Sequence, residues 1–304
     1  MTPTNAITSK TYHAAGKLML LGEYLVLHGA KCLAFPLKFG QELKVGPIQE
    51  VLEWSSHSPS GKWFSCKMNG ELNILESTND KISEKLQQVF YLIKQRKPEL
   101  DLTRSFEIKA NFNLNWGFGS SSTLVSLLSQ WSRVDGYDIL ENTFGGSGYD
   151  IACAQAESPI TYQIMETGRE VKSVKLNPEI TDKLLFVYHG HKQNTAEDVR
   201  MFKSKPINNS ISNTVSSLTD RAIKATSIEE LEEILNESED ALESVLGRSA
   251  LKKSAFTDYP YSIKSLGAWG GDFFLATFLK PEEAESYFKN KGYDTMFYYN
   301  QIAL

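Results

Sequence analysis

The stretch FNLNWGFGSSSTLVSLLSQW, residues 112–131, places two glycines and three consecutive serines between two differently patterned segments. Before the glycines, residues 104–114 alternate between apolar and polar side chains, which predicts a half-buried β-strand. After them, apolar residues recur at helical spacing, so we expect a helix that begins near Ser122. The order strand, Gly/Ser loop, helix constrains the fold more than any other feature of the chain.

This junction has the properties of an anion-binding site. Glycines let the backbone approach a ligand closely, and the N–H groups of the first helical turn are unpaired donors at the positive end of the helix. Phosphate fits such a site, and a serine hydroxyl there is a suitable ligand for magnesium. The alternatives are a flexible linker or simple N-capping, but a linker would not lie between two well-patterned elements. The loop is neither a Walker A loop, because no Lys follows its second Gly, nor a dinucleotide fingerprint, because the third Gly is missing.

Composition bounds the class of protein. A chain of 304 residues with 41% hydrophobic content can bury a large core and form two domains. Its net charge of -5 without a basic run argues against nucleic acid or an anionic membrane as the main partner. The three cysteines, Cys32, Cys66 and Cys153, form no CxxC pair, which favours a reducing cytoplasm over disulfides or zinc. The early apolar run 18–21 is too short for a signal peptide or a membrane span. We expect a cytoplasmic monomer or homodimer.

The remaining pattern predicts a strand-rich first half and a more helical second half. We expect strands at 18–21, 32–37 and 43–48, a hairpin turn at 59–61, and a helix around Ile82 to Ile93. Further on we expect a strand at 184–188, helices at 196–203, 211–224 and 228–246, and a βαβ-like ending with strands at 273–279 and 295–299. The charges of the Glu-rich run 229–243 are expected to form a solvated helix face. The change of texture near residue 181 predicts two domains, 1–180 and 181–304.

Four segments resemble one known family. AAGKLMLLGEYLVLHGA (14–30), NWGFGSSSTL (115–124) and KSLGAWGGDFFLA (264–276) are similar to the three signature motifs of the GHMP kinases, in their usual order. GGSGYDIA (145–152) resembles the segment that carries the catalytic aspartate of that family. The resemblance implies an α+β fold of two lobes with the active site in the cleft between them. The N-terminal, ATP-binding lobe would be strand-rich and carry the Gly/Ser phosphate loop, and the C-terminal lobe would be ferredoxin-like.

The resemblance also implies roles for individual residues. Loop N–H groups would cradle the β- and γ-phosphates of ATP, and Ser121 would coordinate Mg²⁺, with Ser120 a close competitor. Asp150 would accept the proton of the acceptor hydroxyl, and Lys17 would lie near it and keep that carboxylate ionised. From the residues alone, Asp150 is equally suited to capping a helix that begins at Ile151, and Lys17 to an ordinary exposed position. The full nucleotide-binding set is Asn115, Gly117, Gly119, Ser120, Ser121 and Ser122.

Other candidates carry weaker signals. The second Mg²⁺ ligand is predicted to be Glu141, on a short helix over 137–143, with Asp138 as its competitor. His28 is interpreted as structural. His189 and His191 flank Gly190 at the end of a strand. Such a pair can bind a metal ion, but we favour the interpretation that it marks a strand end leading into a helix. The residues expected on the acceptor side are Glu23, Lys192, Thr195, Gly267 and Ala268.

The third motif departs from the family pattern, since Trp269 and Asp272 stand where further glycines are usual. The first motif is most similar to mevalonate and phosphomevalonate kinases, and GYDIA resembles a subgroup of short bacterial GHMP kinases. We therefore expect an ATP-dependent, magnesium-requiring kinase of a small-molecule alcohol, with mevalonate as the favoured acceptor. The alternatives are a phosphomevalonate kinase, a decarboxylase similar to the diphosphomevalonate enzyme, and a non-catalytic ligand sensor with this fold.

Overall fold

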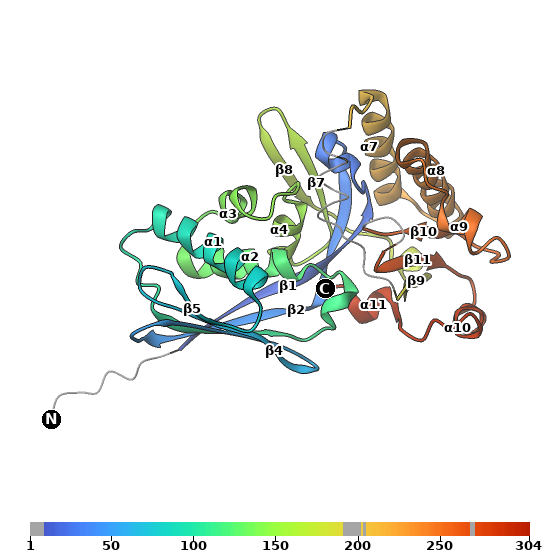
Figure 1. The fold of residues 1–304 in the computed structure, drawn as a ribbon. Coiled ribbons are helices and arrows are strands. Elements are labelled where there is room, and N and C mark those ends of the chain that lie inside the picture. Colours follow the sequence, from blue (N-terminus) through green and yellow to red (C-terminus); the bar gives the residue numbers. More distant parts are fainter. Residues whose placement is uncertain (1–8, 191–201, 203–204, 268–270) are drawn as a thin grey trace. The chain divides into compact units, whose positions relative to one another are not determined.

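The computed structural model describes residues 9–190, 202, 205–267 and 271–304 (Figure 1). The described residues pack into two compact units that interleave along the sequence. The first unit holds the residues up to Gly16, 39–114 and 119–154, and the second holds 17–38, 115–118 and 155–304. The strands β1 (Lys10–Leu21) and β2 (Cys32–Ile48) contribute residues to both units. The contiguous boundary expected at residue 180 stays a prediction.

The first unit is a mixed sheet covered by helices. Its strands follow the order β5-β4-β3-β6-β2, with β3 and β6 parallel and the other neighbours antiparallel. The helices α1 and α2 lie over one face of this sheet (Figure 1). Besides the residues of β1 and β2, the elements are β3 (Leu52–Ser58), β4 (Gly61–Met68), β5 (Ile74–Ser77), α1 (Asp80–Arg96), β6 (Arg104–Ala110), α2 (Ser120–Ser132), α3 (Gly136–Asn142) and α4 (Tyr149–Ala154).

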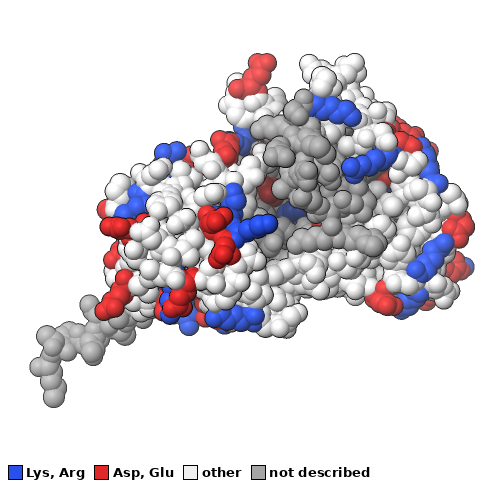
Figure 2. Space-filling model, viewed as in Figure 1, with Lys and Arg blue, Asp and Glu red and all other residues white. Residues whose placement is uncertain are grey.

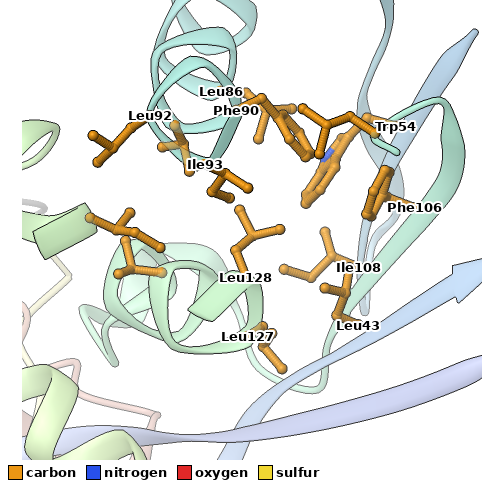
Figure 3. Close-up of a cluster of buried hydrophobic side chains, with 14 of the residues drawn as sticks. Leu43, Trp54, Leu86, Phe90, Leu92, Ile93, Phe106, Ile108, Leu127 and Leu128 are labelled. Atoms are coloured by element: carbon orange, nitrogen blue, oxygen red, sulfur yellow. The ribbon is translucent and has the colours of Figure 1, made fainter. Parts of the chain in front are cut away.

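The core of this unit lies between α1, α2 and the sheet. Asn79 begins α1 by accepting a hydrogen bond from Ile82 N, and the buried residues of the helix recur at helical spacing. The Trp54 and Phe106 rings stack at 5.7 Å on the sheet. Figure 3 shows these rings near Phe90 of α1, with Leu128 of α2 pointing toward them and Leu127 on another side of α2. All five residues belong to one buried core. The labelled core residues are Leu43, Trp54, Leu86, Phe90, Leu92, Ile93, Phe106, Ile108, Leu127 and Leu128.

The second unit contains a four-stranded antiparallel sheet with the order β10-β11-β9-β12. The helices α7 and α8 connect β9 to β10, and α10 connects β11 to β12, so two βαβ units interlock in the ferredoxin-like arrangement. The hairpin of β7 and β8 pairs separately with the first residues of β2. The elements are η1 (Leu25–His28), η2 (Leu114–Trp116, whose first residue belongs to the first unit), β7 (Ile160–Met165), β8 (Gly168–Ser173), α5 (Pro178–Thr181), β9 (Leu184–Tyr188), α7 (Asn209–Lys224), α8 (Ile228–Leu246), α9 (Leu251–Ser254), β10 (Ile263–Ser265), β11 (Phe273–Thr277), α10 (Pro281–Asn290), β12 (Met296–Tyr298) and α11 (Tyr299–Ile302).

The α+β class and the ferredoxin-like C-terminal sheet are confirmed, whereas several boundaries differ. The strands expected at 32–37 and 43–48 are one continuous strand, β2, because its early residues pair with β7 and its later ones with β6. The helix expected from near Ser122 begins two residues earlier, at Ser120. The helix expected at 196–203 lies outside the described residues except for Phe202.

On the face shown in Figure 2, acidic and basic side chains lie intermixed among uncharged residues, and neither sign gathers into one large patch. Across the described residues, no helix combines the length and the apolar character that a membrane crossing requires.

Candidate active site

The N-terminus of α2 has the backbone geometry that the Gly/Ser junction predicts. Gly119 is the N-cap in the left-handed region, with φ of 88°, a conformation that favours glycine. Glycine has no side chain to accept hydrogen bonds from the first-turn N–H groups, so these donors at the positive end of a 13-residue helix remain suited to an anion. The serines here differ in exposure: Ser121 is exposed, whereas Ser122 is buried and donates its hydroxyl to Gly119 O at 2.9 Å.

A buried polar pair missed by sequence reasoning fixes this helix end. The Thr123 hydroxyl lies 2.8 Å from Gln41 Oε1 on β2 and 3.0 Å from Gly119 O. Thr123 N also donates to Gly119 O at 2.9 Å. Because both side chains are buried, these hydrogen bonds tie the last residue of the loop to the sheet. No sequence pattern marks Gln41, which falls within a strand of mixed composition.

Asp150 lies in the first turn of α4, also in the first unit. It is half-buried, and its Oδ1 accepts a hydrogen bond from Ile151 N at 3.1 Å. The helix begins at Tyr149, so Asp150 is not its N-cap residue. The helices α2 and α4 pack against each other. The structure thus places the Asp150 carboxylate at the start of a helix that contacts α2.

The two candidate metal ligands on α3 differ in their surroundings. Glu141 is exposed, and the observed helix agrees with the one expected over 137–143. Asp138 forms a bidentate pair with Arg96, at 2.6 and 3.0 Å, which lowers the pKa of its carboxyl. Among the described residues, no group of three or more His, Cys, Asp or Glu is arranged to hold a metal ion. Glu141 stays a prediction.

Lys17 contacts the chain just before α2, in the second unit. Its Nζ donates to Gly117 O at 3.1 Å, and its backbone N donates to Phe118 O at 3.0 Å. Lys17 is half-buried, in contrast to an ordinary exposed lysine. Gly117 has φ of 65°, and a Cβ there would overlap the Asp272 carboxylate. Residues from the first, second and third motifs therefore meet at Gly117.

Aromatic residues surround the same segment. The Tyr188 hydroxyl donates to Asn115 O at 3.3 Å, and the Phe118 and Phe273 rings stack at 5.1 Å. Burial, with a smaller contribution from the negative charge of Asp272, raises the pKa of Tyr188. Tyr188 ends the β9 strand that the sequence predicts, but its contact with Asn115 has no sequence signal.

Glu23 lies in a buried charged cluster of the second unit. Glu23 Oε1 is 2.7 Å from Lys264 Nζ, and Glu239 Oε1 is 3.5 Å from the same nitrogen. The side chains of Glu23, Lys264 and Glu239 are 1%, 0% and 4% exposed, so their charges are out of water. Burial raises the pKa of Glu23 to about 7, and Lys264 partly opposes that rise.

This cluster corrects one expectation. The Glu-rich run of α8 was expected to be solvated throughout, but Glu239 is buried. It lies four residues after Leu235 and three before Leu242, and so falls on the apolar face of the helix. This spacing from the apolar residues of α8 is the sequence feature that predicts the burial of Glu239.

The remaining candidates are only partly described. Gly267 has φ of 63° after β10, whereas Lys192, Thr195, His191, Ala268 and Trp269 lie outside the described residues. His28 Nε2 lies 3.2 Å from Phe202 O, in agreement with a structural role. The His189 ring stacks on Tyr293 at 6.1 Å.

Comparison with solved structures identifies this architecture. No protein-family model and no curated protein sequence matches the chain. The Streptococcus pneumoniae phosphomevalonate kinase, in complex with phosphomevalonate and AMPPNP, superimposes with a TM-score of 0.72 at 18% identity, over 95% of this chain and 99% of that one. The chain has the GHMP kinase fold.

Two further structures with this fold agree. The L. major mevalonate kinase, in complex with R-mevalonate, gives a TM-score of 0.65 at 16% identity, over 97% of both chains. The Lactococcus lactis galactokinase, complexed with galactose, gives 0.67 at 14% identity, over 97% of this chain and 93% of that one. The GHMP kinase fold is therefore shared with kinases named for different substrates, so the fold alone does not identify an acceptor.

Proposed function

We propose that the protein is an ATP-dependent kinase that phosphorylates a small-molecule alcohol, with mevalonate as the favoured acceptor. The observation that carries the proposal is the loop before α2. It ends at a glycine N-cap that leaves helix N–H donors for an anion, and Lys17 binds its Gly117 carbonyl. Phosphoryl transfer depends mainly on positioning and on electrostatic stabilisation, which are what this loop offers.

The residues present fit a magnesium nucleotide. The cradle is glycine-lined, since Gly117 and Gly119 both have positive φ, and the exposed Ser121 hydroxyl supplies an oxygen ligand of the kind that Mg²⁺ prefers. Magnesium, when bound with the nucleotide, would neutralise phosphate charge. The first-turn N–H groups of α2 would bind phosphate oxygens, and Glu141 would provide a second acidic ligand.

Two further residues have proposed roles in the transfer. Asp150 would accept the proton of the acceptor hydroxyl as that oxygen attacks. Lys17, which already holds Gly117, would favour the ionised form of the aspartate and offset negative charge. Both roles rest on the resemblance of their motifs to those of the GHMP kinases, together with the half-buried positions of the two side chains.

Phosphomevalonate is the second candidate acceptor, favoured by the similarity to the phosphomevalonate kinase structure. The test is ADP release from purified protein with ATP and magnesium, in the presence of mevalonate, phosphomevalonate, diphosphomevalonate or galactose. We expect turnover with mevalonate well above the acceptor-free rate. Turnover only with phosphomevalonate would reassign the acceptor. Release of inorganic phosphate together with carbon dioxide would indicate a decarboxylase, and binding of ATP without turnover on any acceptor would indicate a ligand sensor.

A further inference from the structure

The buried cluster of Glu23, Lys264 and Glu239 is unusual because it places three ionisable groups in the interior of the second unit. Charges removed from water are costly unless they are paired and hydrogen-bonded. A buried ion pair is also weak evidence for stability, since apolar residues of similar volume often do as well. Among the described residues, Glu23 Oε2 has no hydrogen-bond partner, so part of that cost is not offset. A contribution to stability therefore does not account for the cluster.

The cluster holds the backbone at the end of β10. Lys264 Nζ donates to Ser265 O at 2.9 Å, and the Ser265 hydroxyl donates to Glu239 Oε2 at 3.2 Å. Ser265 pairs with Phe274 of β11, and Leu266 N donates to Phe273 O at 3.2 Å. These bonds hold the end of β10 beside the first residues of β11, on either side of the centre of the third motif.

The other end of the cluster lies in a strained turn of the first motif. Tyr24 has φ of 57° and ψ of -46°, and Leu25 N donates to Glu23 O at 2.6 Å, which closes a tight three-residue turn. This conformation is rare for a residue with a side chain and costs free energy. Such strain persists only where the surroundings hold it, and the bond from Lys264 holds the residue before Tyr24.

Asp272, the residue just before β11, in turn contacts the segment that leads into α2. Its carboxylate packs against the Cα of Gly117, and Asp272 O accepts a hydrogen bond from His189 N at 2.8 Å. Gly117 O accepts the bond from Lys17. A continuous set of contacts therefore runs from the buried cluster through the paired ends of β10 and β11 and Asp272 to the residues just before Gly119.

We propose that Glu23, Lys264 and Glu239 are positioning residues for nucleotide binding. By holding the end of β10 against the first residues of β11, they fix the adjacent Asp272 and thereby the segment 115–118 that precedes the phosphate-binding end of α2. None of the three needs to touch the nucleotide, which agrees with their burial. This inference rests on the proposed function, because it assumes that the loop before α2 binds a nucleotide.

The test separates positioning from stability. A triple variant, Glu23→Met with Lys264→Met and Glu239→Leu, replaces the cluster with apolar side chains and leaves no buried charge behind. We expect its unfolding temperature to stay near that of the wild type, while its dissociation constant for AMPPNP with magnesium, measured by calorimetry, rises about tenfold. The matched control is Lys31→Met with Asp220→Leu, an ion pair at 2.7 Å in the same unit that joins Lys31 to α7 rather than to β10 or β11. The control should bind AMPPNP as the wild type does.

A second variant keeps the proposal testable if the triple variant does not fold. Ser265→Ala removes only the hydroxyl that bonds Glu239, and we expect it to weaken AMPPNP binding about threefold. Ser216→Ala, on α7, is its control. Unchanged binding by a folded triple variant, or by Ser265→Ala where the triple variant fails to fold, would overturn the positioning role. Wild-type protein that binds no AMPPNP would instead contradict the proposed function itself.

Discussion

The serine hydroxyls at the start of α2 have different surroundings although the residues are adjacent in sequence. Ser122 is buried and its hydroxyl bonds Gly119 O, whereas Ser121 is exposed at the helix end. Apart from the family resemblance, which favours Ser121 with Ser120 as a close competitor, the sequence does not distinguish the three serines as donors, because a hydroxyl group has no preferred partner until the helix start is known. The observed start at Ser120 separates a structural serine from a candidate ligand.

The first prediction contrasts these two residues. Ser121→Ala should raise the KM for ATP more than the KM for the acceptor, since it removes a proposed magnesium ligand. Ser122→Ala should leave the KM for ATP nearly unchanged but cost about 1 kcal/mol of unfolding free energy, because it removes a buried hydrogen bond. Steady-state kinetics and urea unfolding of both variants test this. Equal KM values for ATP in the wild type and Ser121→Ala would contradict the magnesium role.

A second prediction concerns Gly117. Gly117→Ala should destabilise the protein by at least about 1 kcal/mol, because its φ of 65° disfavours a side chain and the added Cβ would overlap Asp272. The KM for ATP should rise as well. Gly117→Ala with Asp272→Gly should recover part of the stability, because the overlap disappears while the strained φ remains. If thermal unfolding shows no recovery in the double variant, the contact with Asp272 is not what restricts this position.

Residue-level prediction from the sequence was partial. Lys17 was singled out by its motif, and the structure brings it to Gly117. Glu239 was misplaced because the density of charge along its helix outweighed its position on the apolar face. Tyr188 was placed on a strand without any role, since a contact between residues 73 positions apart leaves no local pattern.

At the scale of elements, periodic segments were predicted well and interrupted ones were not. The strand over 184–188 and the helix over 228–246 have the predicted bounds, since each is a continuous pattern with clear ends. In β2, Lys38 and Gly40 interrupt the apolar pattern, yet the strand continues through them. Gly40 allows a close approach to Ala14 of β1, where a Cβ would overlap the backbone. Pairing with neighbouring strands therefore overrides the local break.

The third prediction is made at this scale. Asn79→Ala should destabilise α1 by about 1 kcal/mol, because its side chain caps the helix through Ile82 N. Since α1 supplies Phe90 and Ile93 to the core of the first unit, the loss should appear in overall unfolding by urea. Asn79→Asp, which retains an acceptor oxygen, is the matched control and should be close to the wild type. Equal loss in both variants would exclude capping as the cause.

At the scale of the whole molecule, the titration of Glu23 predicts a pH dependence of stability. Burial raises its pKa from 4.5 to about 7, so the folded state binds this proton more tightly than the unfolded state does. The contribution of Glu23 to stability is therefore fully present below about pH 4.5 and is lost as the pH rises through about 7. The substitution Glu23→Gln replaces this titrating carboxyl group with an amide that does not titrate. Urea unfolding at about pH 5 and about pH 8 should show a smaller decline in the variant. The same decline in both proteins would contradict the assignment.

The fold of the C-terminal sheet could be predicted from the order of its elements along the chain. Strand, helix pair, hairpin, helix and strand follow each other after residue 181, and right-handed crossover connections leave few ways to join them other than the observed β10-β11-β9-β12 sheet. The two compact units could not be read from the sequence, because β1 and β2 serve both of them and no linker separates the two.

The central claim is that the protein transfers a phosphoryl group with Asp150 as the proton acceptor. The most direct measurement is ADP release with mevalonate, ATP and magnesium by the wild type and by Asp150→Asn, with Asp80→Asn, an exposed aspartate of the same unit, as the control. The account predicts turnover by the wild type and the control, and loss of at least about a hundredfold in Asp150→Asn with AMPPNP binding retained. Equal turnover by the wild type and Asp150→Asn would contradict it.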